Sequence, residues 1–177
     1  MKSTKLVLCA FFAALSAILS QVALPIGPEP IAMTHISIFL AAGLLGAKYG
    51  VISQTVYVLI GAFGVPVFPW FVGGLSILVG PRGGFIIGYL ICSLVTGLLY
   101  DTFGASYRAQ IPAMCVGFLV TYVPGVAWFM FQTGNSLTNT LLVSILPFLP
   151  FDIIKTLASA SLIKRLRPVV RRRMVHS

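Results

Sequence analysis

The stretch that decides the fold is residues 144–173, SILPFLPFDIIKTLASASLIKRLRPVVRRR, in which an apolar run leads into a basic cluster. The run holds one acid, Asp152, and one base, Lys155, and a helix places residues three apart on neighbouring parts of one face. Each charge at the centre of a membrane-spanning helix costs about 2.5–3.5 kcal/mol, so this face must point into a bundle. There the pair either locks one helix against its neighbours or forms part of a polar site. Because buried ion pairs are poor stabilisers, we favour the site.

The composition identifies the solvent of this chain as lipid. Of 177 residues, 58% are hydrophobic and 8% are charged, whereas a soluble domain has about a quarter charged residues. The mean hydropathy is +1.02. The apolar runs are continuous and do not alternate with polar residues, which predicts membrane helices and not the strands of a barrel. The expected fold class is an all-α, polytopic membrane protein.

Six apolar runs predict one domain, residues 1–177, with six transmembrane helices. The expected spans are residues 6–24, 31–47, 51–67, 85–100, 111–131 and 137–163. The first run could also be a signal peptide, but it is long, lacks a small-residue cleavage site before Pro25, and is followed by further spans. Residues 64–84 are rich in glycine, proline and aromatic residues, so we expect a loop folded onto or into the bundle.

The basic residues predict the orientation of these spans. With the N-terminus in the cytoplasm, ten bases fall inside and only Arg82 falls outside, as the positive-inside rule requires. The ten are Lys2, Lys5, Lys48, Arg108, Lys164, Arg165, Arg167, Arg171, Arg172 and Arg173. We therefore expect both termini to be cytoplasmic. The net charge of +9 then reports topology and, in the C-terminal cluster, contact with anionic lipid heads, and it does not point to nucleic acid.

The depth of the charged pair suggests a cavity in the outer half of the bundle. If the last span is one continuous helix and Lys164 lies at the inner surface, Lys155 lies about 13 Å and Asp152 about 18 Å above that surface. Pro147 and Pro150 each remove a helix hydrogen bond, so they should bend or open the chain just before Asp152. Arg82 in the sequence GPRGG, the base assigned outside, is either a loop anchor or a third charge facing this cavity.

The residues expected around the cavity suit a small, partly apolar ligand with a carboxylate and N–H donors. Asp152 would accept its N–H bonds, and the bases would take its carboxylate. The expected substrate-binding residues are Asp152, Lys155, Arg82, Gly83, Gly84, Phe68, Phe71 and Tyr89, with Trp70 beside them. Ser20 and Gln21 could face the same cavity. For His35 we prefer a hydrogen-bonded place in a helix interface to a place in the cavity wall.

Several other kinds of site need residue patterns that this sequence does not contain. No lysine with Ser or Thr follows the glycines of GPRGG, so we expect no ATP site on this chain. Two histidines and three scattered carboxylates do not make a metal centre or a catalytic group, and we expect no enzyme activity, no cofactor and no metal. Cys9, Cys92 and Cys115 are odd in number and widely spaced, so we expect them to be buried thiols.

Small residues repeat at a spacing of four in the first apolar run. Ala10 and Ala14 form one such pair and Ala13 and Ala17 another, and this spacing lets two membrane helices approach closely. The four alanines either pack inside the bundle or form a docking face for a separate membrane partner. Both interpretations stay open from the sequence.

The chain resembles the BioY family, the biotin-specific substrate-binding subunits of energy-coupling factor (ECF) transporters. The resemblance covers nearly the whole chain. It is most specific in AAGLLGAKYGVISQTVYVLIGAFGVPVF (41–68), VGPRGGFIIGYL (79–90) and PFDIIK (150–155).

The resemblance implies a multi-pass protein of a prokaryotic cytoplasmic membrane that binds biotin from outside with high affinity. Asp152 would pair with ureido N–H groups or share a network with Lys155, and either Lys155 or Arg82 would meet the valerate carboxylate. Transport would require a transmembrane coupling subunit and two cytoplasmic ATPases. The first helix would slide against the coupling subunit while the binding subunit topples in the membrane.

Three other functional classes compete with this interpretation. A proton- or ion-coupled secondary transporter of a small carboxylate-bearing molecule would use Asp152 as its proton carrier. An intramembrane enzyme would need a nucleophile with a base, or clustered metal ligands. A purely structural membrane protein would leave the charges at membrane depth unexplained.

Overall fold

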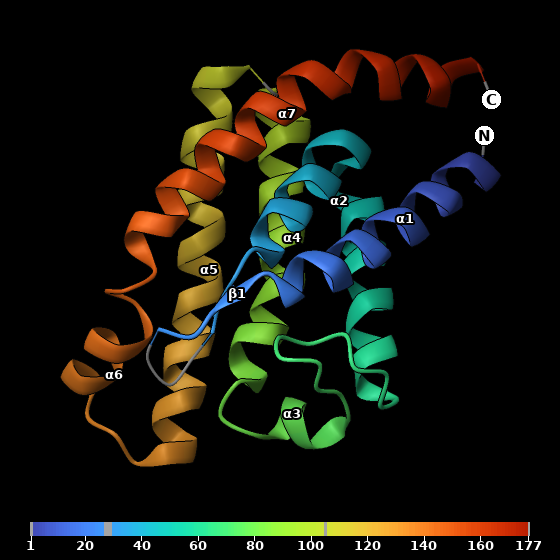
Figure 1. The fold of residues 1–177 in the computed structure, drawn as a ribbon. Coiled ribbons are helices and arrows are strands. Elements are labelled where there is room, and N and C mark those ends of the chain that lie inside the picture. Colours follow the sequence, from blue (N-terminus) through green and yellow to red (C-terminus); the bar gives the residue numbers. More distant parts are fainter. Residues whose placement is uncertain (1, 27–29, 105, 177) are drawn as a thin grey trace.

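The chain forms a bundle of long helices, seen in a computed structural model that describes residues 2–26, 30–104 and 106–176 (Figure 1). The long helices are α1 (Lys2–Gln21), α2 (Thr34–Ala62), α4 (Gly83–Phe103), α5 (Tyr107–Thr133) and α7 (Leu149–His176). The short elements are strands β1 (Ala23–Leu24) and β2 (Ile31–Ala32) and helices α3 (Leu75–Val79) and α6 (Leu137–Ser144). The strands are antiparallel, with Ala23 opposite Ala32.

Within the described residues, four helices are long and apolar enough to cross a membrane: α1 from Ser3, α2, α4 and α5. The pair α6 and α7 makes a fifth candidate, bent by 50° at the break between them. The chain is therefore a helical protein with several membrane spans, as the sequence predicts. The expected number of six spans and the cytoplasmic position of both termini are not confirmed. The count differs because the runs expected at 31–47 and 51–67 are joined in one element, α2.

A break inside α2 explains how one element contains both runs. Gly46 has φ 81° and ψ 175°, a backbone conformation that favours glycine, and helix continues on both sides of it. Asp101, near the end of α4, accepts a hydrogen bond from the Ala47 N–H at 3.1 Å and so satisfies the first amide after the break. Figure 1 shows the chain reversing its direction there, so the two parts of α2 run in opposite senses.

The last expected span is also broken, and this corrects the assumption of one continuous helix over 137–163. Residues 145–148 separate α6 from α7. Pro147 lies in the break and Pro150 in the first turn of α7, in agreement with the bend that these prolines predict. Helix α7 then continues through the basic cluster to His176. The break leaves Asp152 in the first turn of α7, where its N–H donates to the Phe148 carbonyl at 2.9 Å.

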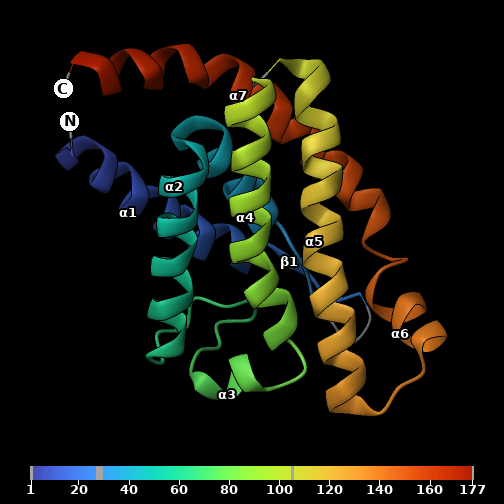
Figure 2. The same cartoon turned by 180° about the vertical axis from the view of Figure 1, so that it is seen from behind.

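Close packing around α4 holds the bundle together. A Cβ added at Gly88 would lie 2.9 Å from the Thr121 backbone of α5, and one at Gly97 would lie 2.4 Å from the Ala47 backbone of α2. These glycines therefore let α4 approach both neighbours closely, as small residues do between membrane helices. Figures 1 and 2 show α4 beside α5, with α3 and the start of α6 at the end of the bundle opposite both chain termini.

The loop of residues 63–74 is fastened to the end of α1. Ser20 Oγ donates to the Val67 carbonyl at 2.5 Å, and Gln21 Nε2 donates to the Phe68 carbonyl at 3.1 Å. The Phe71 N–H donates to Gln21 Oε1 at 2.9 Å. Ser20 and Gln21 are candidates from the sequence for facing the cavity, and their side chains bind the backbone of this loop.

Candidate functional site

The charged pair picked out in the sequence lies inside the protein. Lys155 Nζ donates to Asp152 Oδ1 at 3.1 Å, and the exposed fractions of the two residues are 1% and 6%. Both project from the first two turns of α7, directly after the break. The prediction that the pair points into the bundle is confirmed.

A third polar group, Tyr122 of α5, completes this cluster. Its hydroxyl donates a hydrogen bond to Asp152 Oδ2. Both carboxylate oxygens of Asp152 therefore have a partner, as a charge at membrane depth requires. Each oxygen can still accept a further bond, and the Lys155 ammonium has donors besides the one used on Asp152. The cluster can thus offer both acceptors and donors to a ligand.

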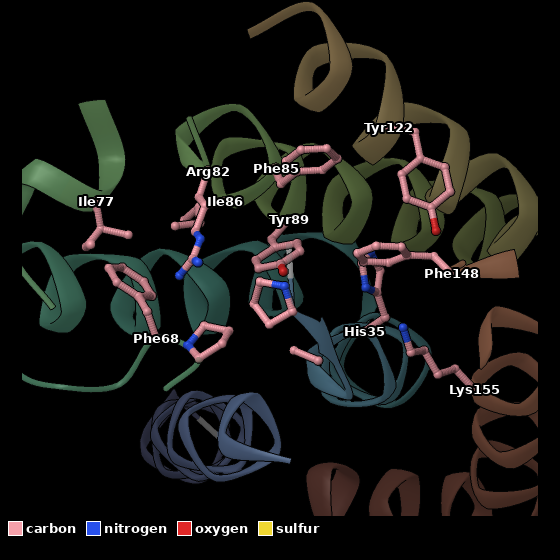
Figure 3. A pocket seen from close by; sticks show the side chains of 13 residues that line it. His35, Phe68, Ile77, Arg82, Phe85, Ile86, Tyr89, Tyr122, Phe148 and Lys155 are labelled. Atoms are coloured by element: carbon pink, nitrogen blue, oxygen red, sulfur yellow. The ribbon is translucent and has the colours of Figure 1, made fainter. Parts of the chain in front are cut away.

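A small cavity of about 40 Å³ adjoins this cluster (Figure 3). Its lining comes from the β2 region, the loop of residues 63–74, α2, α3, α4, α5 and the start of α7. The lining residues are Pro30, Ala32, His35, Phe68, Pro69, Ile77, Arg82, Phe85, Ile86, Tyr89, Tyr122, Phe148 and Lys155. Four of the expected site residues, Phe68, Arg82, Tyr89 and Lys155, are therefore brought together here.

Lys155 and Arg82 lie toward opposite ends of this cavity in Figure 3. Arg82 is the residue directly before α4, and its guanidinium lies 4.6 Å from the centre of the Trp70 ring. Trp70 and the neighbouring Phe71 have φ of 68° and 55°, which is uncommon for residues with large side chains. Such backbone conformations cost free energy and persist where surrounding contacts enforce them. The loop thus covers the Arg82 end of the cavity in a constrained conformation.

The other expected site residues lie around the cavity and not in its wall. Asp152 does not line the cavity itself, but it is hydrogen-bonded to two residues that do, Lys155 and Tyr122. Phe71 is 72% exposed and is bound to Gln21 through its backbone. At Gly83 an added Cβ would meet the Leu78 carbonyl, and at Gly84 it would lie 2.4 Å from the Trp128 side chain. These two glycines therefore set how closely the start of α4 packs on its neighbours.

His35, near the start of α2, lies in the cavity wall. It is 6% exposed, and its Nε2 has no hydrogen-bond partner among the described residues. Its ring packs against the rings of Phe39, Tyr89 and Phe118. The expectation of a hydrogen-bonded interface position is wrong for this nitrogen, and the alternative of a polar wall residue is supported.

A second and larger hollow lies on the other side of Tyr122. This groove has a volume of about 1050 Å³ and runs between α5 and the pair α6–α7. Its walls are apolar apart from Tyr122, Asp152 and Thr156, and exposed leucines such as Leu119 and Leu141 line it. Cys115 also lines the groove and is exposed, which corrects the expectation of three buried thiols. Cys9 and Cys92 are buried as expected.

The alanines of α1 divide between the surface and the core. Ala10 and Ala14 are exposed and Ala17 is half-buried, whereas Ala13 is buried against the cluster that contains Tyr57. Exposed large apolar residues of the same helix are Leu6, Val7, Phe11 and Ile18. The surface of α1 outside the bundle is therefore apolar, with small residues at Ala10 and Ala14.

Comparisons with known proteins agree on one family. The model of the BioY family matches residues 1–172. The biotin transporter BioY of Thermotoga maritima is 34% identical, and the match covers 92% of this chain and 95% of that protein. The probable biotin transporter BioY of Pyrococcus horikoshii is 32% identical over 94% of this chain and 98% of its own length.

A solved structure gives the same result for the fold. It is the S-component for biotin from an ECF-type ABC transporter, and it superimposes with a TM-score of 0.88 at 30% sequence identity. The match covers 94% of this chain and 92% of that one. Because the family model matches residues 1–172 of the 177 residues, this multi-pass membrane protein belongs to the BioY family.

Proposed function

We propose that this protein is the biotin-binding membrane subunit of an ECF-type vitamin transporter and that it takes biotin from the outer side of the membrane. The observation that carries the proposal is the buried Asp152–Lys155–Tyr122 cluster at one end of a cavity whose other end holds Arg82. The functions printed for the relatives support it. An enzyme activity is not part of the proposal.

The chemistry of biotin fits the two ends of the cavity. Its cyclic urea has two N–H donors and one carbonyl acceptor, and its valerate chain ends in a carboxylate. Asp152 accepts from a urea N–H, and Lys155 donates to the urea carbonyl. Arg82 then takes the carboxylate through charge-assisted hydrogen bonds. Lys155 is the weaker candidate for the carboxylate because Asp152 already partly neutralises it.

Apolar groups would hold the part of biotin between its two polar ends. Tyr89 lines the cavity between Arg82 and Lys155, and Phe68 lines it at the Arg82 end. Gly83 and Gly84 contribute by allowing the close packing that positions Arg82 at the start of α4. Phe71 belongs to the loop over the cavity.

The small size of the cavity indicates a closed form of the site. Ligand pockets usually have about 300–1,000 Å³, far more than the 40 Å³ found here. Biotin therefore needs the loop of residues 63–74 to move, together with the Arg82–Trp70 contact that it carries. Such a loop would close over the bound vitamin and exclude water.

For the topology, we propose six crossings with both termini in the cytoplasm. The reversal of the chain at Gly46 supports counting the two parts of α2 as separate crossings, and α6 with α7 makes the last. The ten bases on the cytoplasmic side then follow the positive-inside rule.

The partners in this proposal are a transmembrane coupling subunit and two cytoplasmic ATPase subunits. The coupling subunit docks on the exposed face of α1 at Ala10 and Ala14, with Ala17 at its edge. Small residues there allow close approach of a second helix. Ala13 is excluded from the docking face because it is buried in the bundle.

A titration of the purified protein with biotin tests the binding function. We expect one saturable site, and we expect lipoate, which has a carboxylate but no urea, to bind far more weakly. Trp70 beside Arg82 gives a fluorescence signal for loop movement, and Trp70→Phe identifies its contribution. Failure of the wild-type protein to bind biotin in detergent and in nanodiscs would refute the proposal.

Uptake measurements separate this function from ion-coupled transport. In cells without other biotin transport, uptake should require co-expression of the coupling subunit and the ATPases. Uptake by this chain alone that collapses with the proton gradient would favour the secondary transporter instead.

A further inference from the structure

The polar wall residue His35 lies at the Lys155 end of the cavity. In Figure 3 its ring lies close to Phe148 and Lys155 and away from Arg82. More than nine-tenths of the residue is buried, and Nε2 has no partner among the described residues. A buried polar atom without a partner costs free energy, so this nitrogen calls for a partner that enters the cavity.

Three aromatic rings fix the orientation of this imidazole. Its centre lies 4.8 Å from the centre of the Phe118 ring, 5.2 Å from Tyr89 and 5.9 Å from Phe39. The Tyr89 ring meets it edge-on, at 85°. These contacts come from α2, α4 and α5, so the ring is held before any ligand arrives. A polar group held in place in this way loses little conformational freedom on binding, which favours affinity and selectivity.

The charged cluster alone does not satisfy a cyclic urea. The two N–H groups of such a ring point away from each other on either side of the carbonyl. Asp152, tied to Tyr122 and Lys155, can accept from one N–H, and Lys155 can donate to the carbonyl. The second N–H then needs an acceptor from another element of the wall.

We infer that His35 Nε2 accepts a hydrogen bond from the second urea N–H, so that the site selects cyclic ureas in which both nitrogens are unsubstituted. This inference rests on the proposed function, because it assigns one contact within that site. It makes α2 a part of ligand recognition along with α4 and α7. A ligand that lacks either N–H should bind more weakly, and a different residue should account for the loss of affinity in each case.

A binding cycle between ligand and protein variants tests this assignment. The proteins are the wild type, His35→Ala and His35→Gln, and the ligands are biotin and its two isomers methylated at one or the other urea nitrogen. His35→Ala should bind biotin about tenfold more weakly, which corresponds to about 1.4 kcal/mol. One methyl isomer should bind the wild type poorly and be rescued by His35→Ala, which removes the acceptor and makes room for the methyl group. The other isomer, methylated on the side of Asp152, should be rejected equally by both proteins.

The outcomes distinguish this inference from the proposed function. No biotin binding by the wild type refutes both. Normal binding by the wild type, with unchanged affinity in His35→Ala, overturns only the role of His35. Equal responses of the two isomers to His35→Ala would indicate a general packing or water-binding role and would also overturn it. His35→Gln retains an acceptor, so partial recovery of affinity supports the inference even if His35→Ala folds poorly.

Discussion

Neutralising the buried pair one residue at a time, and then together, separates its effect on folding from its effect on ligand binding. Asp152→Asn leaves the Lys155 ammonium almost fully buried without its acid. Breaking a buried pair in this way costs about 3–5 kcal/mol of unfolding free energy. Lys155→Met leaves the carboxylate with the Tyr122 hydroxyl as its remaining partner, so its cost should lie at the lower end of that range.

The double variant Asp152→Asn/Lys155→Met should behave differently. With both charges gone, no ionised group remains in the first two turns of α7, and removing a buried ion pair as a whole is often neutral for stability because no buried charge is left without its partner. Additive single effects would predict a loss of about 6–8 kcal/mol. We therefore expect an apo protein at least as stable as the wild type that nevertheless fails to bind biotin.

The assay combines unfolding in detergent with biotin titration of the same preparations. Tyr122→Phe serves as a control because it keeps both charges and removes one hydrogen bond to Asp152. Biotin binding by the double variant at wild-type affinity would show that the pair is structural. A double variant as unstable as the sum of the single variants would refute the argument that pairing offsets the cost of burial.

Three further predictions concern other parts of the chain. Arg82→Gln should weaken biotin binding about 10–100-fold, because hydrogen bonds to charged groups contribute about 1.5–3 kcal/mol, while leaving the affinity for biotin methyl ester nearly unchanged in a titration. Equal losses for acid and ester would exclude Arg82 as the carboxylate partner. Ala14→Leu should preserve biotin binding and reduce uptake with the partner subunits. Ala13→Leu, a matched change in the core, should lower the free energy of unfolding by about 1–3 kcal/mol. Normal uptake with Ala14→Leu would show that this face is not part of the docking site. Asp101→Ala should lower the unfolding free energy by about 1 kcal/mol through loss of the cap at the α2 break, with Thr102→Ala as an exposed control that has no such effect in chemical denaturation. Equal midpoints for both variants would contradict the capping role.

The parts of the site that the sequence predicted are those where local chemistry is unusual. Asp152 and Lys155 are rare residue types for an apolar run, so their direction and burial followed from the cost of charge in lipid alone. Pro147 and Pro150 predicted the break just before Asp152 for an equally local reason. The choice between an ion pair for stability and a polar site depended on the neighbours, which the sequence does not reveal.

Tyr122 and His35 were missed or misjudged because their roles depend on other elements. Tyr122 is one of six tyrosines, and only the packing of α5 beside α7 brings its hydroxyl to Asp152. A phenol in the middle of an apolar span was the available signal. His35 was expected to have a hydrogen bond because buried polar atoms usually do. Its unsatisfied nitrogen could be recognised only once three aromatic rings were seen around it.

The number of spans illustrates a different limit. Gly46 and the charged Lys48 close to it suggest a turn, but they do not tell whether the helix resumes at once. That depends on Asp101, more than 50 residues away in the chain, which caps the amide after the break. A long-range contact therefore decided how two apolar runs were joined.

Because the loop of residues 63–74 is hydrogen-bonded to Ser20 and Gln21, a movement of this loop is coupled to a movement of α1. One part of it meets the membrane, and the other holds the cover of the cavity. A membrane partner that binds α1 more tightly in one loop position than in the other must change the affinity for the ligand. The ligand must then change the affinity for that partner by the same factor. A partner that binds α1 within the membrane can thus distinguish an empty site from an occupied one without contacting the ligand.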